Sequence, residues 1–282
     1  GPALAFTHDG LSIRNRVEFT AKGLEKKWAV LSGAESSLGS LALVQAHDDL
    51  LKHIYTMITH LGDTSNLILD PDLDTYYLMD VTLLVVPQLQ ERLNRISMAI
   101  LTRDASKAIS VSERAVFGNY LTLLRESDMD RLRASAGTAN REDPNFFGKS
   151  ETLGARLPPA VDALSQRIAG VESYLEGLST GKIDKIDSDH AYLLLSTAIQ
   201  GTGVFWDIAG EELRLMMENR IEQQTLDRTR ALYFTTFAWL LSLITVLFVG
   251  RAVLEKQKIL AEKIQEQGVT IVATSKFSSL GE

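Results

Sequence analysis

The run from Ala231 to Gly250, ALYFTTFAWLLSLITVLFVG, constrains the fold of this chain most strongly, because its twenty residues include no charged side chain. At about 1.5 Å of rise per residue, a helix of this length spans the roughly 30 Å hydrocarbon core of a bilayer. Arg230 and Arg251 flank the run directly. Buried helices of soluble proteins rarely stay free of charge for so long. We therefore expect residues 231–250 to form a transmembrane helix in a lipid bilayer, not a buried core helix.

Composition excludes several classes of protein. The chain has 282 residues, a net charge of −7 and no cysteine, so it can form neither a disulfide nor a thiolate metal site. No basic stripe stands out, and we expect no nucleic-acid partner. The opening residues, GPALAFTHDG, lack the basic start and apolar run of a secretory signal. We expect a first transmembrane helix to precede residue 1.

Before the apolar run, apolar residues recur at spacings of three and four, and no convincing strand pattern occurs. The segment from Ser135 to Pro159 is polar and is interpreted as a loop. We predict an all-α fold in which residues 1–230 form an elongated antiparallel helical bundle, an extracytoplasmic sensor domain. The predicted helices cover about 13–61, 70–101 with a kink before Pro87, 105–134, 159–178, and 188 onward into the apolar run.

The stretch DPDLDTYYLMD, residues 70–80, is the first candidate site. Asp70 and Pro71 are typical of a helix start, where an aspartate caps free N–H groups and proline has no donor to lose. A ligand pocket is the alternative use of these side chains. The candidate ligand-binding residues are Asp74, Tyr76, Tyr77 and Asp80.

Three histidines, His47, His53 and His60, are candidate metal ligands together with Asp49. His53 and His60 share a helix face but lie two turns apart, about 10 Å, whereas paired ligands on one helix prefer a spacing near four. We interpret them as ordinary surface or core positions, and we predict no metal site and no catalytic residue in this chain.

Beyond the apolar run, Val253, Leu260, Ile264 and Ile271 follow one another at spacings of seven, four and seven, a heptad seam. Residues 251–274 are therefore predicted to form a parallel coiled coil that joins two copies in a homodimer; a single amphipathic helix is the alternative. The basic residues that follow Gly250 place this end in the cytoplasm and residues 1–230 in the periplasm.

The last eight residues, SKFSSLGE at 275–282, resemble the start of the dimerisation and phosphoacceptor helix of sensor histidine kinases, which precedes the phosphorylated histidine. The resemblance implies a two-component system in the bacterial inner membrane. The full protein would then use ATP and magnesium to phosphorylate a histidine beyond Glu282, and would pass the phosphoryl group to a response regulator. The stretch at 70–80 is also similar to segments of extracellular helical sensor modules of bacterial kinases and chemoreceptors. No HAMP-like linker is recognisable after Gly250.

Two other interpretations stay open. A methyl-accepting chemoreceptor would share the outer architecture but would continue into a long methylated hairpin. A membrane-anchored helical structural protein would show no coupling of its cytoplasmic end to any stimulus. The identity of that stimulus, a small molecule or a protein, does not follow from the sequence.

Overall fold

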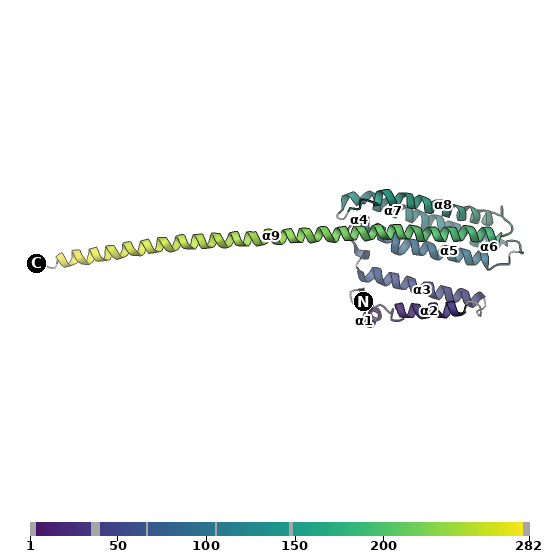
Figure 1. Cartoon of the computed structure of the whole chain (residues 1–282), viewed down its shortest axis with the longest axis horizontal. Helices are drawn as coiled ribbons and strands as arrows, with labels where there is room; N and C mark the ends of the chain where they lie inside the picture. The colour runs from purple at the N-terminus through teal and green to yellow at the C-terminus, as the bar shows by residue number, and fades with distance from the viewer. Residues whose placement is uncertain (1–3, 35–39, 66, 105, 147–148, 279–282) are drawn as a thin grey trace. The chain divides into compact units, whose positions relative to one another are not determined.

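The computed structural model describes residues 4–34, 40–65, 67–104, 106–146 and 149–278, and within these ranges all regular structure is helical, with no strand (Figure 1). The chain divides into two compact units, Gly1–Ile221 and Glu222–Glu282. The helices are α1 His8–Ser12, α2 Ala21–Ala34, α3 Ser40–Ser65, η2 Leu67–Leu69, α4 Leu73–Met79, η3 Asp80–Val85, α5 Val86–Leu101, α6 Val111–Thr122, η4 Leu123–Met129, α7 Asp130–Glu142, η5 Asp143–Asn145, α8 Leu153–Thr180 and α9 Ser188–Ser278. Of the short elements, η2 and η5 are 3₁₀ helices, whereas η3 and η4 are π-helices.

The core of the first unit is built by α4 to α8 and by the first part of α9. In this core α4 lies against α7, and α6 lies against α8. Leu89, Leu164 and Phe205 are almost completely buried at its centre. Full burial of one such side chain contributes about 1.5–3 kcal/mol relative to exposure, so these faces hold the helices together.

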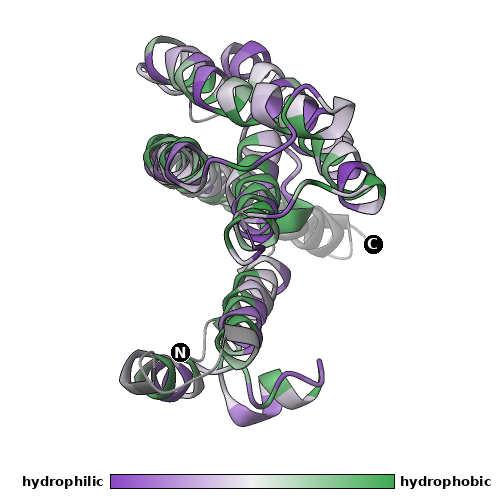
Figure 2. Cartoon of the chain, turned by 90° about the vertical axis from the view of Figure 1, so that its right-hand side faces the viewer, coloured by the Kyte–Doolittle hydropathy of each residue, from purple (hydrophilic) through white to green (hydrophobic). Residues whose placement is uncertain are grey.

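Helices α1, α2 and α3 lie to one side of the core helices (Figures 1 and 2). A single helix was expected over residues 13–61. The structure instead has separate helices there, because α2 ends at Ala34 and α3 begins at Ser40. His53 and His60 are buried on one face of α3. The Nε2 atom of His53 lies 2.9 Å from the carbonyl oxygen of Thr20, and Nε2 of His60 lies 3.1 Å from that of Ala5. Both histidines thus tie the N-terminal segment to α3.

The prediction of a loop from Ser135 to Pro159 is wrong at both ends of the segment, because α7 continues to Glu142 and α8 begins at Leu153. Leu153 and Leu157 are buried in the core, which favours the helix despite two prolines that follow inside it. Proline removes a backbone hydrogen bond of the helix. Here the burial of the two leucines offsets that loss.

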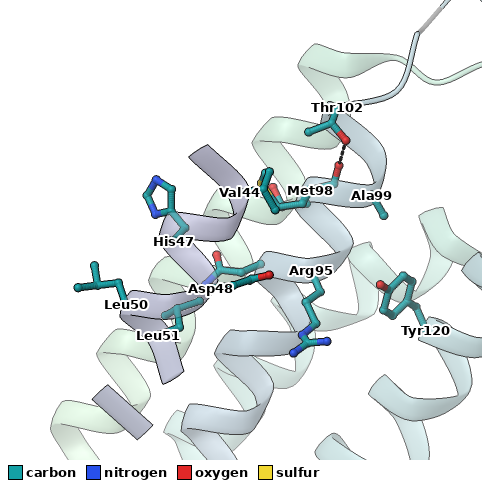
Figure 3. Close-up of a pocket in the computed structure, with 12 residues that line it drawn as sticks. Val44, His47, Asp48, Leu50, Leu51, Arg95, Met98, Ala99, Thr102 and Tyr120 are labelled. Carbon is teal, nitrogen blue, oxygen red and sulfur yellow. Dashed lines mark hydrogen bonds between the residues drawn. The ribbon is translucent and has the colours of Figure 1, made fainter. Parts of the chain in front are cut away.

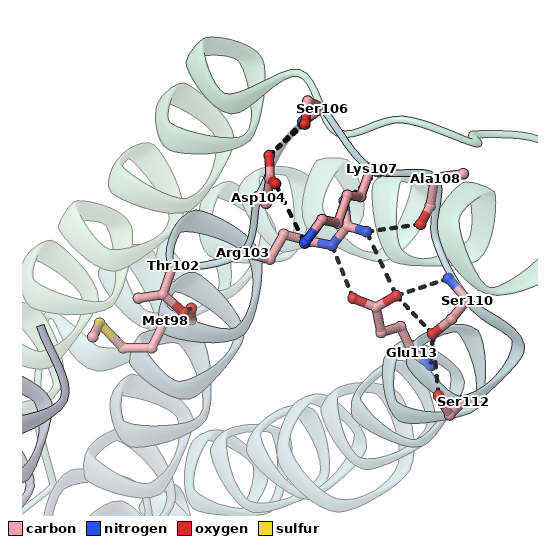
Figure 4. A network of polar contacts seen from close by, with 10 residues as sticks. All are labelled: Met98, Thr102, Arg103, Asp104, Ser106, Lys107, Ala108, Ser110, Ser112 and Glu113. Atoms are coloured by element: carbon pink, nitrogen blue, oxygen red, sulfur yellow. Dashed lines mark hydrogen bonds and ion pairs between the residues drawn. The ribbon is translucent and has the colours of Figure 1, made fainter.

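The connection between α5 and α6 is held by a polar network around Arg103 (Figure 4). The guanidinium donates to the Glu113 carboxylate at 2.9 Å and to the carbonyl oxygens of Lys107 and Ala108, both at 3.0 Å. Ser110 and Glu113 form a capping box, so α6 begins at Val111 and not near the predicted residue 105. The Arg103 and Ser110 hydrogen bonds lower the pKa of Glu113 to about 2.

The helix was expected to kink before Pro87, and at that place the structure has the π-helical segment η3. A second π-helical segment, η4, separates α6 from α7. Proline at 87 cannot donate to the carbonyl four residues earlier, so a regular α-helix is weakened there. A side-chain contact also reaches this proline from another helix: the hydroxyl of Tyr55 in α3 donates to the Pro87 carbonyl oxygen at 2.6 Å and ties α3 to α5.

The second unit, considered by itself, consists of the continuation of α9. By length and composition its apolar window is able to cross a membrane, and none of that window is buried. The hydroxyl groups of Thr235, Thr236 and Thr245 donate to carbonyl oxygens four residues earlier, so their polar atoms are satisfied within the helix. The predicted seam residue Ile271 and the whole SKFSSLGE motif lie outside the residues whose side chains are described.

Candidate functional site

A buried polar network joins the start of α4 to α9, and Arg220 is its centre. Its Nη1 atom donates to both carboxylate oxygens of Asp70, each at 2.9 Å, and Nη2 lies 2.8 Å from Asp72 and 2.5 Å from the Thr75 hydroxyl. The Asp70 and Asp72 side chains are 4% and 17% exposed. One guanidinium therefore binds two carboxylates that have little contact with solvent.

This arrangement corrects the capping role expected of Asp70. The N-cap of α4 is Asp72, whose side chain makes no capping hydrogen bond, and the helix begins at Leu73 instead of Pro71. Asp70 accepts a hydrogen bond from the Asp72 N–H at 3.0 Å. Both carboxylates are used mainly by Arg220, a partner that is distant in sequence.

Asp74 lies beside this ion pair and is completely buried. Its Oδ1 atom accepts a hydrogen bond from the Thr75 N–H at 2.6 Å, but Oδ2 has no hydrogen-bond partner among the described residues. Burial raises the pKa of Asp74; the Thr75 N–H and Arg220 act in the opposite direction, and the negative charges of Asp72 and Asp143 add to the rise. The ionised form of this side chain is therefore less favourable than that of an exposed aspartate.

A second group of carboxylates continues the network at the start of α8. Glu212 of α9 is completely buried and accepts hydrogen bonds from the hydroxyls of Ser150 and Thr152, at 2.7 and 2.8 Å, and from Arg156 at 2.6 Å. Asp143 accepts from the Ser150 N–H at 2.8 Å. Burial raises the pKa of Asp143, and the nearby charge of Glu212 raises it further. Glu212 is well satisfied, whereas the Ser150 N–H and the positive charge of Lys149 only partly oppose the rise in the pKa of Asp143.

A third buried polar group lies at the two π-helical segments. Asp80, the first residue of η3, accepts hydrogen bonds from Arg131 at 2.5 Å and from the Ser135 hydroxyl at 3.0 Å. Asp128 of η4 binds the guanidinium of Arg92. Arg131 belongs to α7 and Arg92 belongs to α5, so each ion pair joins a π-helical segment to one of these helices. They tie the π-helical segments to their neighbours.

The four predicted ligand-binding residues are separated in the structure. Asp74 and Asp80 are buried in different networks, while Tyr76 is 36% exposed and Tyr77 is half-buried against the core. The two tyrosine rings make an edge contact, with centroids 5.3 Å apart. Binding of a ligand by these residues therefore stays a prediction.

Sequence reasoning missed Arg220, Glu212 and Asp143. A signal for two of them was present, because Glu212 and Arg220 follow Ala209 and Met216 at helical spacing on the buried face of α9. A charged side chain on an apolar stripe needs a buried partner. Asp143 carries no such signal, since its neighbours are polar.

A groove of about 700 Å³ lies between α3 and α5, and Tyr120 of α6 also lines it (Figure 3). Val44, Leu51 and Met98 supply apolar walls, and Asp48 and Arg95 supply opposite charges. Such a mixture suits a small amphipathic molecule. Within the described part of the chain, no group of three or more histidine and carboxylate side chains is arranged to hold a metal ion.

Comparison with known proteins identifies no relative. No known protein family matches the chain, and neither a curated protein nor a solved structure matches it.

Proposed function

We propose that this chain is the signal-sensing and transmembrane-signalling part of a bacterial sensor histidine kinase. Residues 1–230 form an elongated antiparallel bundle in the periplasm, and residues 231–250 cross the inner membrane. Residues 251–274 pair as a parallel coiled coil in the cytoplasm, and residues 275–282 begin the dimerisation and phosphoacceptor helix. In the whole protein a stimulus in the periplasm controls histidine phosphorylation from ATP and magnesium, and a response regulator receives the phosphoryl group.

The observation that supports this proposal is the composition of α9. Ser188–Ser278 is one helix, whose first part contributes Phe205 and Met216 to the core of the first unit. The same helix then carries the twenty-residue apolar run and the heptad positions. A rigid helix transmits a small shift or rotation along its length, which is a known means of signalling between domains.

The resemblance of SKFSSLGE to the kinase helix is tested by the native sequence beyond Glu282 and by the activity of the longer protein. We expect a histidine within about a dozen residues, and acid-labile label on it after incubation with labelled ATP and magnesium. Replacement of that histidine by glutamine should abolish the label. A long hairpin with methylated glutamates would instead establish a chemoreceptor. If neither feature is found, the interpretation that is left is a membrane-anchored helical protein.

The predicted sidedness has an independent test, because the chain contains no cysteine. Asp162 lies on the exposed side of α8, and Glu262 is exposed in the second unit. A membrane-impermeant thiol reagent should label Asp162→Cys in spheroplasts, but should label Glu262→Cys only after the membrane is permeabilised. Equal labelling of both variants before permeabilisation would contradict a membrane between them.

A further inference from the structure

We propose that Asp74 is a proton-binding site, and that the proton it binds holds residues 212–220 of α9 against α4 and the start of α8. The site lies within the first unit, so it is independent of the chain beyond Glu282.

The geometry at Asp74 requires a proton more clearly than at any neighbouring carboxylate. The side chain is completely buried, and Oδ2 has no partner within the described part of the structure. An ionised carboxylate that is buried without enough donors is strongly unfavourable, whereas the neutral acid is tolerated. Glu212, which is equally buried, and Asp70, whose side chain is 4% exposed, each have a guanidinium partner.

Among the described residues near Asp74, the buried cation is Arg220, which already binds two other carboxylates and whose Nε atom has no hydrogen-bond partner. Arg220 of α9 binds Asp70 and Asp72, and Arg156 of α8 binds Glu212. Within the described residues, the charged groups near the site include five carboxylates, Asp70, Asp72, Asp74, Asp143 and Glu212, and three cations, Lys149, Arg156 and Arg220. Lys149 is exposed. Two carboxylates therefore exceed the cations, and Asp74 and Asp143 are the two whose pKa burial raises.

A proton bound at Asp74 is coupled to the docking of α9. When residues 212–220 separate from α4, water reaches Asp74 and its pKa returns towards the ordinary value of about 3.9. Because the pKa is raised in the docked state, docking binds a proton and is fully favourable at low pH. The docked state is then weakened as pH rises through the raised pKa. Alkalinisation should loosen α9, and acidification should hold it.

The proton itself is tested on the full chain in detergent micelles by infrared titration. A protonated carboxyl group gives a carbonyl band distinct from that of carboxylates. We expect a band that disappears above the range in which exposed aspartates titrate, and a weaker band in Asp74→Asn, in which buried carboxyl groups such as Asp143 can still contribute. The control Asp162→Asn changes an exposed carboxylate of α8 and should retain the band. Absence of the band in the unsubstituted chain, or a band of unchanged intensity in Asp74→Asn, would overturn the proposal.

Docking is tested by spin labels at Leu69→Cys and Glu218→Cys, two exposed positions on either side of the Asp70–Arg220 pair. The labelled chain is diluted with unlabelled chain, so that the measured distance joins two labels on one molecule and not labels on two copies. We expect a single short distance at low pH that broadens as pH rises, and a short distance at all pH values after Asp74→Asn. A distance that does not change with pH in the unsubstituted chain, or that still changes in Asp74→Asn, would refute the coupling.

Discussion

Replacing Arg220 by alanine should destabilise the first unit far more than replacing an arginine of an exposed ion pair in α9. Arg220 is 8% exposed and supplies donors to Asp70, Asp72 and Thr75. Its removal leaves two carboxylates without their cation in a site that water reaches poorly. Such an uncompensated buried charge typically costs about 3–5 kcal/mol.

The expected shift in unfolding temperature follows from the size of the unit. For a folded unit of this length, about 221 residues, 1 kcal/mol corresponds to about 2–4 °C. We therefore expect the midpoint of thermal unfolding, followed by circular dichroism of the full chain in micelles, to fall by about 10 °C. The double variant Arg220→Ala with Asp70→Asn should recover part of this loss, because it removes one of the stranded charges.

Arg214 provides a matched control on the same helix. It also contacts two carboxylates, Glu211 at 2.7 Å and Glu218 at 2.5 Å, but all three side chains are about half exposed. Exposed ion pairs contribute little to stability because solvent and salt screen them. Arg214→Ala should leave the unfolding midpoint almost unchanged. Equal effects of the two substitutions, or no recovery in the double variant, would refute the argument from burial.

Three further changes test other parts of the first unit. Trp206→Phe removes the indole N–H that donates to the Thr82 carbonyl at 2.7 Å, and should cost about 1 kcal/mol in denaturant unfolding; an unchanged midpoint would contradict it. Gly181→Ala should cost about 1–2 kcal/mol in the same assay, because φ is +78° and a Cβ would lie 2.9 Å from Nη1 of Arg114; a neutral result would show that the turn relaxes. Glu113, whose pKa is about 2, contributes stability that is present above its unfolded pKa of about 4.3 and is lost as pH falls towards 2. Glu113→Gln should therefore flatten the acid dependence of the melting midpoint, and an unchanged slope would show that this network does not contribute.

Helical periodicity predicted the parts of the fold that a local pattern can specify. The last helix was expected to begin near Ser188 and does so, and the helix containing Pro87 ends at Leu101 as expected. Apolar spacing indicates which face is buried, so an all-helical structure followed from it directly. The helix over Leu153 and Leu157 was missed because glycine, proline and polar residues surround those two leucines.

The candidate site was less predictable, because its bonds join residues far apart in sequence. Asp70 and Arg220 are separated by 150 positions, and nothing near Asp70 distinguishes an ion pair from a helix cap. Asp74 was selected as a possible ligand-binding residue for its place in an acidic stretch. Asp74 is completely buried with one unpartnered oxygen, and the charges near it include Arg220 of α9 and Asp143 of η5, neighbours that the local sequence does not reveal.

The two π-helical segments have a consequence for how the chain tolerates changes in length. A π turn holds one residue more than an α turn, since its hydrogen bonds reach one residue further. Removing one residue within η3 or η4 can therefore convert that turn to an ordinary α turn while the following helix keeps its buried face. The same deletion inside α5 would rotate every later side chain of the helix by about 100°. Length variation in this first unit should thus be accommodated at 80–85 and 123–129, beside the buried carboxylates Asp80 and Asp128.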